Sequence, residues 1–251
     1  MRAPLLRLEA LVKRFGTLAV ADEVSFAVNP GRLVALIGPN GAGKTTLINL
    51  ISGALGADAG RILFDGEDIA RLDMPARARL GLARSFQIAA VFPEFSALEN
   101  VALAVQARLG ANFRFWRPAA AEEAFNAPAR AALERVGLLA RGGTPAGFLS
   151  HGDQRLLELA LALALRPRLM LLDEPFAGLG PEETRDGVAL LASLKGEFAI
   201  LLVEHDIDAV FALADEIGVL VNGRLMAWGP PHVIRADAAV RAAYLGQEAG
   251  A

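Results

Sequence analysis

The chain has 251 residues, of which 54% are hydrophobic and 21% charged. This composition excludes a disordered chain, and the length suits one large domain or two small ones. Twenty-five basic residues against 28 acidic ones give a formal charge of −3, so a generic nucleic-acid-binding surface is not expected. Cysteine is absent, which excludes disulfides, thiolate metal sites and a cysteine nucleophile. Without disulfides or a secretory segment, the expected compartment is the cytosol.

A mean hydropathy of +0.39 raises the question of a membrane span. The most apolar stretch, 156–172, contains Glu158, Arg166, Pro167 and Arg168. It cannot supply the roughly 20 apolar residues that a membrane-spanning helix needs. We therefore expect a helix that runs into a buried strand, and no crossing of the bilayer.

The first half of the chain predicts strands, then a helical segment. Strands are expected at 5–13, 24–28, 32–37 and 60–64, the last followed by the turn Asp65-Gly66 and a partner strand. Residues 44–51 predict a helix after a glycine-rich loop. From about 88 to 158 the sequence is alanine-rich and helical in pattern, with a capping box at Ser96 and Glu99.

Strand patterns return in the second half, at 169–172, 199–203, 219–221 and 225–228. A helix begins at Pro181, since proline and two acids in a first turn favour a helix start. Asn222-Gly223 predicts a tight hairpin between the last two strands. Apolar strands alternating with helices predict an α/β core with a parallel sheet, into which the helical segment is inserted.

Residues 38–45, Gly-Pro-Asn-Gly-Ala-Gly-Lys-Thr, satisfy the phosphate-loop pattern G-x-x-x-x-G-K-[ST] between a predicted strand and a helix. Glycines let the backbone wrap around phosphate, and the helix N-terminus favours anions. Lys44 is then expected to neutralise the β- and γ-phosphates of a nucleotide, and the Thr45 hydroxyl to bind Mg²⁺.

Two further motifs point to the same chemistry. An apolar strand ends at Asp173 and Glu174, which predicts a magnesium-binding carboxylate and a second one that polarises the attacking water. The segment 148–155, Phe-Leu-Ser-His-Gly-Asp-Gln-Arg, places Ser150 and Gly152 at the start of an apolar helix. Such a start can bind an anion or be an ordinary N-cap.

The phosphate loop, the Leu-Ser-His-Gly-Asp-Gln segment and the Asp-Glu-Pro strand follow one another in the order and spacing of the ABC transporter ATP-binding cassette. The chain resembles this family from about 5 to 246, and the segment 149–154 resembles the family's signature motif. The resemblance implies one domain over 1–251. Its RecA-like P-loop core, with an N-terminal antiparallel β subdomain, would comprise 1–87 and 159–251, and its helical subdomain 88–158.

The resemblance also assigns site residues for ATP and Mg²⁺. Gln87 resembles the Q-loop glutamine, which touches Mg²⁺ and the water, and His205 the switch histidine at the γ-phosphate. With Glu174 these are the implied catalytic residues, and Thr45, Gln87 and Asp173 the implied metal ligands. Phe15 resembles the aromatic residue that stacks on adenine. The implied nucleotide-binding residues are Phe15, Gly38, Pro39, Asn40, Gly41, Ala42, Gly43, Lys44, Thr45, Thr46, Ser150, His151 and Gly152.

The sequence departs from the family pattern at three positions. His151 stands where glycine is usual, Asp153 where glutamine is usual, and Gly180 replaces the aspartate of the D-loop. Because Ser150 and the backbone amides remain, phosphate binding is still expected. Loss of the D-loop acid changes a contact that this family makes between two cassettes.

The long helical segment, the sequence after Pro175 and the ending Ala243-Tyr244-Leu245-Gly246 are similar to the ATPase subunits of branched-chain amino acid importers of the LivG type. The implied activity is ATP hydrolysis coupled to uptake of branched-chain or other hydrophobic amino acids. Urea or amide importers, aromatic-acid importers and the lipopolysaccharide-export cassette share much of the pattern and remain alternatives.

The resemblance implies partners and a location. The partners are two transmembrane permease subunits, a second cassette and, indirectly, a periplasmic substrate-binding protein, with no nucleic acid. A heterodimer of cassettes is expected and a homodimer stays open. The implied location of the chain is the cytoplasmic face of the plasma membrane, as a peripheral subunit. Soluble ABC proteins that act on DNA or ribosomes usually carry two cassettes, whereas this sequence shows the pattern of one. A P-loop kinase or GTPase would lack the signature and the switch histidine. Both classes are therefore disfavoured.

Overall fold

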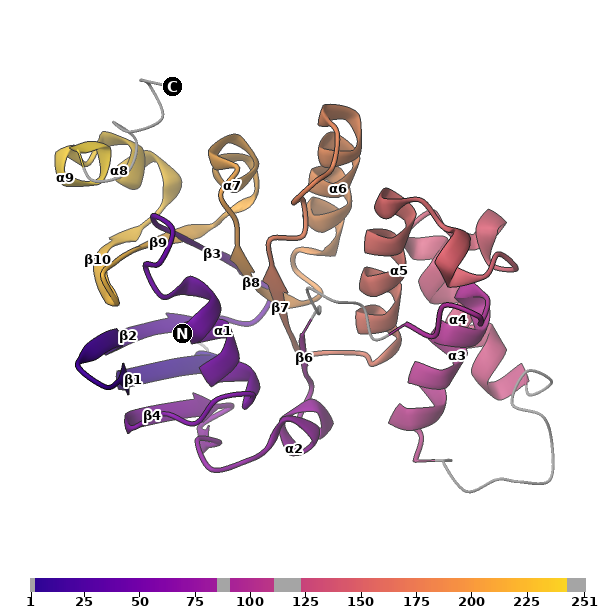
Figure 1. Cartoon of the computed structure of the whole chain (residues 1–251), viewed down its shortest axis with the longest axis horizontal. Helices are drawn as coiled ribbons and strands as arrows, with labels where there is room; N and C mark the ends of the chain where they lie inside the picture. The colour runs from indigo at the N-terminus through magenta and orange to yellow at the C-terminus, as the bar shows by residue number, and fades with distance from the viewer. Residues whose placement is uncertain (1–2, 85–90, 111–122, 243–251) are drawn as a thin grey trace.

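The structure is a computed structural model that describes residues 3–84, 91–110 and 123–242. Its strands form two sheets, one of four strands in the order β2-β1-β4-β5 and one of six in the order β10-β9-β3-β8-β7-β6 (Figure 1). Helices cover the six-stranded sheet on both faces, and a separate helical group lies at one end of the molecule. This arrangement confirms the predicted α/β core with an antiparallel β part and an inserted helical part.

The four-stranded sheet is antiparallel. Its strands are β1 (Leu6–Phe15), β2 (Leu18–Val28), β4 (Ala59–Phe64) and β5 (Glu67–Asp68). The register of β1 and β2 shifts near Ala10, whose φ is 45°, and the Ala10 N–H donates instead to the Ser25 hydroxyl at 2.8 Å. Gly60 lies opposite this bulge, where an added Cβ would sit 2.4 Å from the Ala10 carbonyl oxygen.

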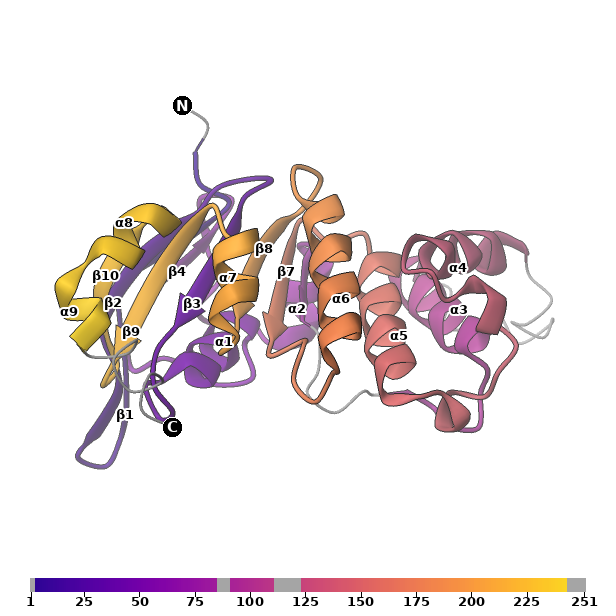
Figure 2. The ribbon, with the colours of Figure 1, turned by 90° about the horizontal axis from the view of Figure 1, so that it is seen from above.

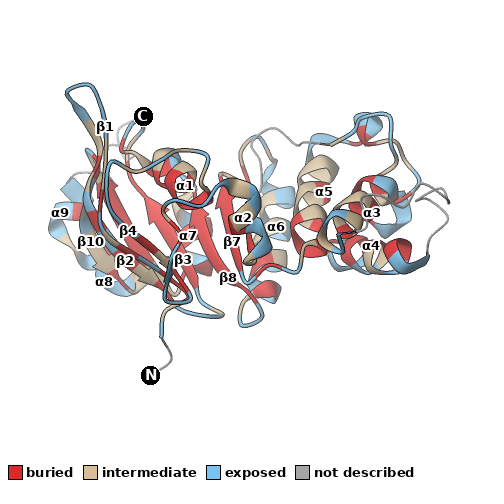
Figure 3. Ribbon diagram, turned by 90° about the horizontal axis from the view of Figure 1, so that it is seen from below, coloured by how far each residue is buried: buried red, intermediate tan, exposed pale blue. Residues whose placement is uncertain are grey.

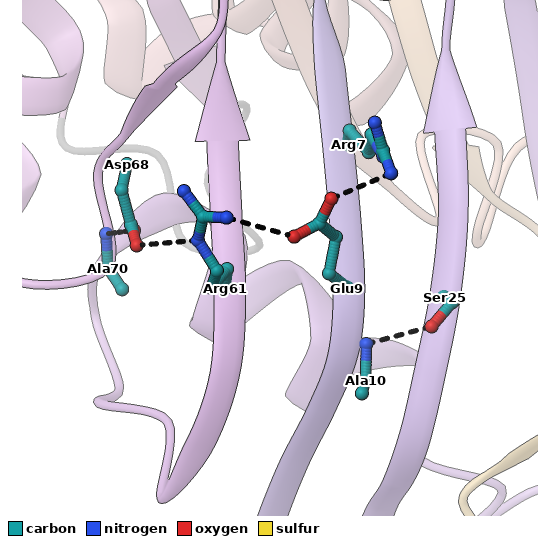
Figure 4. A network of polar contacts seen from close by, with 7 residues as sticks. All are labelled: Arg7, Glu9, Ala10, Ser25, Arg61, Asp68 and Ala70. Atoms are coloured by element: carbon teal, nitrogen blue, oxygen red, sulfur yellow. Dashed lines mark hydrogen bonds and ion pairs between the residues drawn. The ribbon is translucent and has the colours of Figure 1, made fainter.

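Charged side chains gather on the solvent face of this sheet (Figure 4). Arg61 on β4 contacts Glu9 on β1 and Asp68 on β5, each at 3.4 Å, and Arg7 pairs with Glu9 at 2.8 Å. The Arg61 side chain is 58% exposed, so these pairs are screened by water and stabilise the fold little. The opposite face is apolar and buried.

Five strands of the six-stranded sheet are parallel and the sixth is an antiparallel edge. They are β3 (Leu33–Ile37), β6 (Leu82–Arg84), β7 (Leu169–Asp173), β8 (Ala199–Val203), β9 (Glu216–Val221) and β10 (Arg224–Gly229). Every residue of β3, β7 and β8 is buried, because both faces of these strands are covered. The hairpin predicted at Asn222-Gly223 joins β9 to β10.

Alternate residues of the parallel strands enter two different cores. Val34 and Leu36 face α1 (Lys44–Ser52) and the antiparallel sheet, whereas Ala35 and Ile37 face α6 (Pro181–Leu194) and α7 (Ile207–Leu213). Helix α1 therefore lies between the two sheets, and α6 and α7 cover the other face (Figures 2 and 3). Three shorter helices are α2 (Met74–Arg79), α8 (Pro231–Ala236) and α9 (Ala238–Val240).

The helical group contains α3 (Ala97–Arg108), α4 (Glu123–Arg135) and α5 (His151–Ala164), with short 3-10 turns at Leu139–Arg141 and Ala146–Phe148. The predicted capping box is present, because Ser96 and Glu99 exchange hydrogen bonds at the start of α3. Position 158 lies inside α5, so a subdomain boundary there, which stays a prediction, divides a continuous helix. Across the described residues, no helix has the length and apolar character to traverse a lipid bilayer.

Candidate active site

Three loops that the sequence analysis singled out meet at one edge of the six-stranded sheet. The phosphate loop follows β3, Asp173 and Glu174 end β7, and His205 follows β8. Strands β3 and β7 both pair with β8, and Val203 on β8 lies beside Leu36 and beside Asp173. Because the strands are parallel, their carboxyl ends, and the loops that follow them, lie next to one another.

The phosphate loop has a backbone that requires glycine. Gly38, Gly41 and Gly43 have φ values of 154°, 80° and 103°. An added Cβ would lie 2.0 Å from the Leu220 carbonyl oxygen at Gly38 and 2.2 Å from the Val20 carbonyl oxygen at Gly43. Gly43, the N-cap, has no side chain with which to cap the first N–H groups of α1, and the described residues form no side-chain cap there. That helix end is suited to an anion.

Lys44 turns back into this loop. Its side chain is buried, and Nζ donates to the carbonyl oxygens of Gly38 at 2.6 Å and Pro39 at 3.1 Å. Burial lowers the pKa of Lys44, while the nearby carboxylates of Glu174 and Asp173 raise it. The loop thus holds a cationic group among backbone donors, which is the arrangement that binds a polyphosphate.

Asp173 is fully buried at the end of β7 and faces this loop. In the described part of the chain neither of its carboxylate oxygens has a hydrogen-bond partner, and the Arg84 guanidinium lies 3.7 Å away. Burial raises the pKa of Asp173, against the opposing charge of Arg84. The Thr45 hydroxyl also lowers this pKa, although the two groups do not meet in hydrogen-bond geometry. Two orphaned oxygens beside a hydroxyl fit a divalent cation.

Glu174 and His205 lie at the same edge. Glu174 has a φ of 50°, an unusual value for a residue with a side chain, and its N–H donates to the Val203 carbonyl oxygen at 2.8 Å. The His205 side chain is 58% exposed, so it can reach a bound ligand. Glu204 directly precedes His205 in the sequence, and its carboxylate is completely buried.

The predicted helix start at Ser150 is an N-cap. The Ser150 hydroxyl accepts from the Asp153 N–H at 3.1 Å and donates to the Asp153 carboxylate at 2.9 Å, which also pairs with Arg141 at 2.6 Å. Gly152 is approached closely by Glu183 of α6, whose Oε1 would lie 2.5 Å from an added Cβ. The unusual Asp153 thus brings a carboxylate to the signature, neutralised by Arg141.

The structure does not bring the signature and the phosphate loop of one chain together. Ser150 and Gly152 line a cavity of about 440 Å³ with residues of α5 and α6, and no phosphate-loop residue lines it. Helix α5 lies beyond α6 and β7 when viewed from α1 (Figure 1). His151 lines a different cavity, again with no residue of the phosphate loop. Ser150, His151 and Gly152 thus lie away from the phosphate loop of their own chain.

Phe15, the predicted adenine-stacking residue, lies on the four-stranded antiparallel sheet. Phe15 ends β1 with 54% of its surface exposed, and the Lys13 ammonium lies 5.6 Å from its ring centre. An aromatic side chain so exposed at a strand end is available for stacking. Gln87 and the chain end Ala243-Tyr244-Leu245-Gly246 lie outside the described residues.

Sequence reasoning missed two charged residues at the site, Arg84 and Glu204. Arg84 ends β6 and donates to the Asn49 side chain at 2.6 Å while it faces Asp173. Glu204 directly follows an apolar strand, as Asp173 ends one, and that shared pattern was the available signal.

Comparisons with known proteins agree with this geometry. The ABC transporter family matches residues 21–177, and the branched-chain amino acid ATP-binding cassette transporter family matches 224–250. The high-affinity branched-chain amino acid transport ATP-binding protein BraF of Pseudomonas aeruginosa is 41% identical over 98% of this chain and 100% of its own length. Its counterpart LivG of Escherichia coli K12 is 38% identical over the same shares.

Among solved structures, the ADP conformation of MJ1267, an ATP-binding cassette of an ABC transporter, superposes with a TM-score of 0.86 at 32% identity and covers 98% of this chain and 100% of its own. A family match over more than half of the sequence, full-length relatives and a shared fold all agree. The chain belongs to the ABC transporter family, as one of its ATP-binding cassettes.

Proposed function

We propose that this chain is the ATP-hydrolysing subunit of an ABC importer that drives uptake of branched-chain or other hydrophobic amino acids. The arrangement at the sheet edge carries the ATPase part: a buried carboxylate with orphaned oxygens, Asp173, lies beside a phosphate loop and Glu174. The full-length likeness to BraF and LivG, which are named for branched-chain amino acid transport, supports the cargo.

In this proposal the chain holds ATP through backbone and charge. The glycine loop and the N-terminus of α1 surround the phosphates, and Lys44 neutralises them at the loop. Thr45, Asp173 and Gln87 would hold Mg²⁺. The described residues contain no cluster of three His, Cys, Asp or Glu side chains, and Mg²⁺ needs few protein ligands when phosphates and water complete its shell. When bound, Mg²⁺ neutralises charge that develops on the phosphates.

Glu174 then orients and polarises the attacking water, because it directly follows the metal ligand and its backbone is fixed by Val203. His205 reaches the γ-phosphate, as its exposure allows. Gln87, which lies outside the described residues, would contact the metal and the water. Phe15 stacks on adenine. Ser150, His151 and Gly152 bind the nucleotide held by a second cassette, since they lie away from their own phosphate loop.

We place the chain at the cytoplasmic face of the plasma membrane, bound to two permease subunits and served indirectly by a periplasmic binding protein. Residues 88–95 are the expected docking segment. Its described part, 91–95, contains Phe92 and Phe95, whose exposed rings lie 5.3 Å apart. Exposed aromatic side chains of this kind are typical of contact surfaces.

The second cassette is expected to be a different chain, because Gly180 lacks the acidic D-loop side chain. Gly180 is the N-cap of α6 with a φ of −73°, and an added Cβ would lie 3.7 Å from the Glu183 carboxylate. Neither the backbone nor the space requires glycine there, so Gly180→Asp is sterically tolerated. In a Glu174→Gln background that prolongs any closed dimer, light scattering with ATP should report monomers for Gly180 and more dimer for Gly180→Asp. A tight homodimer with Gly180 in place and full hydrolysis would refute the heterodimer.

The cargo is tested by reconstitution. The chain is assembled in vesicles with the permeases and second cassette encoded beside its gene, and phosphate release is measured with the cognate binding protein. Loading that protein with leucine should stimulate ATP hydrolysis, whereas urea, an aromatic carboxylic acid or lipopolysaccharide should not. Stimulation by one of those alternatives in place of leucine would overturn the cargo and leave the ATPase intact.

A further inference from the structure

Glu204 is a buried carboxylate that the proposed mechanism does not use. It directly follows β8, is 0% exposed, and accepts three backbone hydrogen bonds. Oε1 accepts from the Phe176 N–H at 2.9 Å, and Oε2 accepts from the N–H groups of His205 at 2.9 Å and Asp206 at 3.3 Å. One side chain therefore binds the loop after β7 with one oxygen and the loop after β8 with the other.

Burying the Glu204 carboxylate costs free energy, and the fold could form without that cost. A carboxylate removed from water is expensive unless its oxygens are hydrogen-bonded, and an apolar residue at a strand end would avoid that cost. The three amides satisfy the charge and in turn fix the backbone of both loops. A second link joins the same loops, because the Glu174 N–H donates to Val203 at 2.8 Å.

These two links hold in place Glu174 and His205, to which the proposed function assigns the orientation of water and the contact with the γ-phosphate. Glu174 is the first linked point of its loop, two residues before Phe176, which is the second, and it holds an unusual φ of 50°. His205 is itself one of the amides bound by Glu204. A shift of about 1 Å at a catalytic group can lower a rate about 100-fold, so a clamp at this point bears directly on turnover.

We propose that Glu204 is a positioning residue that holds Glu174 and His205 in one geometry, so that the water-orienting and phosphate-contacting groups act as a unit. This proposal rests on the proposed function of those two residues. Within the described residues, Glu204 forms hydrogen bonds with Phe176, His205 and Asp206 and with no residue of the phosphate loop, so ATP binding should not depend on it.

The test is Glu204→Gln in the full chain, with phosphate release measured over a range of Mg-ATP concentrations. The glutamine oxygen can still accept from Phe176, but its NH₂ group then faces two N–H donors and cannot accept from them. The expected kcat is about 10- to 100-fold lower, with KM for ATP changed less than about threefold. Glu134→Gln, an exposed acid on α4, is the matched control and should change neither value.

A second pair of measurements separates positioning from a loss of folding. Glu204→Asp keeps the charge but shortens the reach, so it should bind one loop only and recover part of kcat; it decides the question if the glutamine variant does not fold. In a His205→Ala background, Glu204→Gln should lower kcat by less than it does alone, because both changes act on the same unit.

Three results would overturn the proposal: wild-type kcat in Glu204→Gln, a raised KM at constant kcat, or full additivity with His205→Ala. The failure of the proposed function looks different. If Glu174→Gln and His205→Ala themselves turn over at the wild-type rate, the roles of those residues are wrong. If those two are inactive and Glu204→Gln is normal, the positioning role alone is wrong.

Discussion

Arg77 offers a sharp test of how the nucleotide-binding helix is supported. This arginine on α2 is 1% exposed and donates to four carbonyl oxygens: Leu50 at 2.7 Å and Ile51 at 2.8 Å, at the end of α1, and Leu72 at 2.9 Å and Ala70 at 3.0 Å. Its charge therefore caps the C-terminus of α1, the helix that begins at the phosphate-loop motif. A cation at that end also interacts favourably with the helix dipole.

The perturbation is Arg77→Met, which keeps much of the volume and removes every donor. All four carbonyls lose their arginine donor, but the Leu50 carbonyl keeps a bond from the Gly53 N–H at 3.3 Å, which leaves three without a replacement. Each buried carbonyl left without a partner costs about 1–3 kcal/mol, and relief from burying the guanidinium offsets part of that sum. The free energy of unfolding should fall by about 3–5 kcal/mol, with Tm lower by roughly 6–20 °C.

The assay is urea denaturation of the nucleotide-free protein, with thermal unfolding beside it. Arg79→Met is the matched control, because Arg79 is on the same helix and exposed. It should change the free energy of unfolding by less than about 0.5 kcal/mol. If Arg77→Met is no more destabilising than Arg79→Met, the capping of α1 by Arg77 is wrong.

Three further predictions test the contact of Phe15 with adenine, the surface ion pairs of Arg61 and the effect of Glu158 on the pH dependence of stability. Phe15→Ala should weaken ATP binding about 5- to 150-fold, the range for loss of one base stacking contact, with an unchanged Tm; unchanged affinity in a nucleotide titration would exclude the stacking role. Arg61→Ala should change the free energy of unfolding by less than about 1 kcal/mol, because its pairs are exposed, and a loss above 2 kcal/mol in urea denaturation would contradict this. Burial raises the pKa of Glu158 above its ordinary value of 4.5. The folded state therefore keeps a proton that the unfolded chain has lost, and stability falls as pH rises through that window. Glu158→Gln removes this loss, so its Tm should match the wild type near pH 4 and exceed it increasingly toward pH 7; a difference independent of pH would refute the reasoning.

The sequence was sufficient to predict those elements whose pattern is local. Within the predicted strands, 33–37 and 169–172 are apolar throughout because both of their faces are covered. The phosphate loop needs glycines at fixed positions. The long strand β2 was only partly predicted: Leu18 to Glu23 include two acids, and Glu23 has a φ of 57° at an irregular register with β1. A bulge breaks the alternation on which strand prediction depends.

Residues that act through distant contacts could not be predicted. Arg77 belongs to a short polar helix whose sequence looks exposed, and only the tertiary contact with the end of α1 explains its burial. Arg84 and Glu204 are single charges at strand ends. Arg84 contacts Asn49 and Asp173, and Glu204 contacts Phe176, all of them far away in the sequence. Ser150 was correctly placed at a helix start, but its separation from the phosphate loop depends on how the helical group packs.

The central claim is that Lys44 and Asp173 hold Mg-ATP while Glu174 supports its hydrolysis. It is tested most directly by measuring ATP affinity and phosphate release on the same preparations of wild type, Glu174→Gln and Lys44→Ala. We predict that Glu174→Gln binds ATP as the wild type does but releases phosphate at least about 100-fold more slowly, since the carboxylate that orients water is gone. Lys44→Ala should already fail at binding. Near-normal phosphate release by Glu174→Gln, or unchanged ATP affinity in Lys44→Ala, would contradict the account.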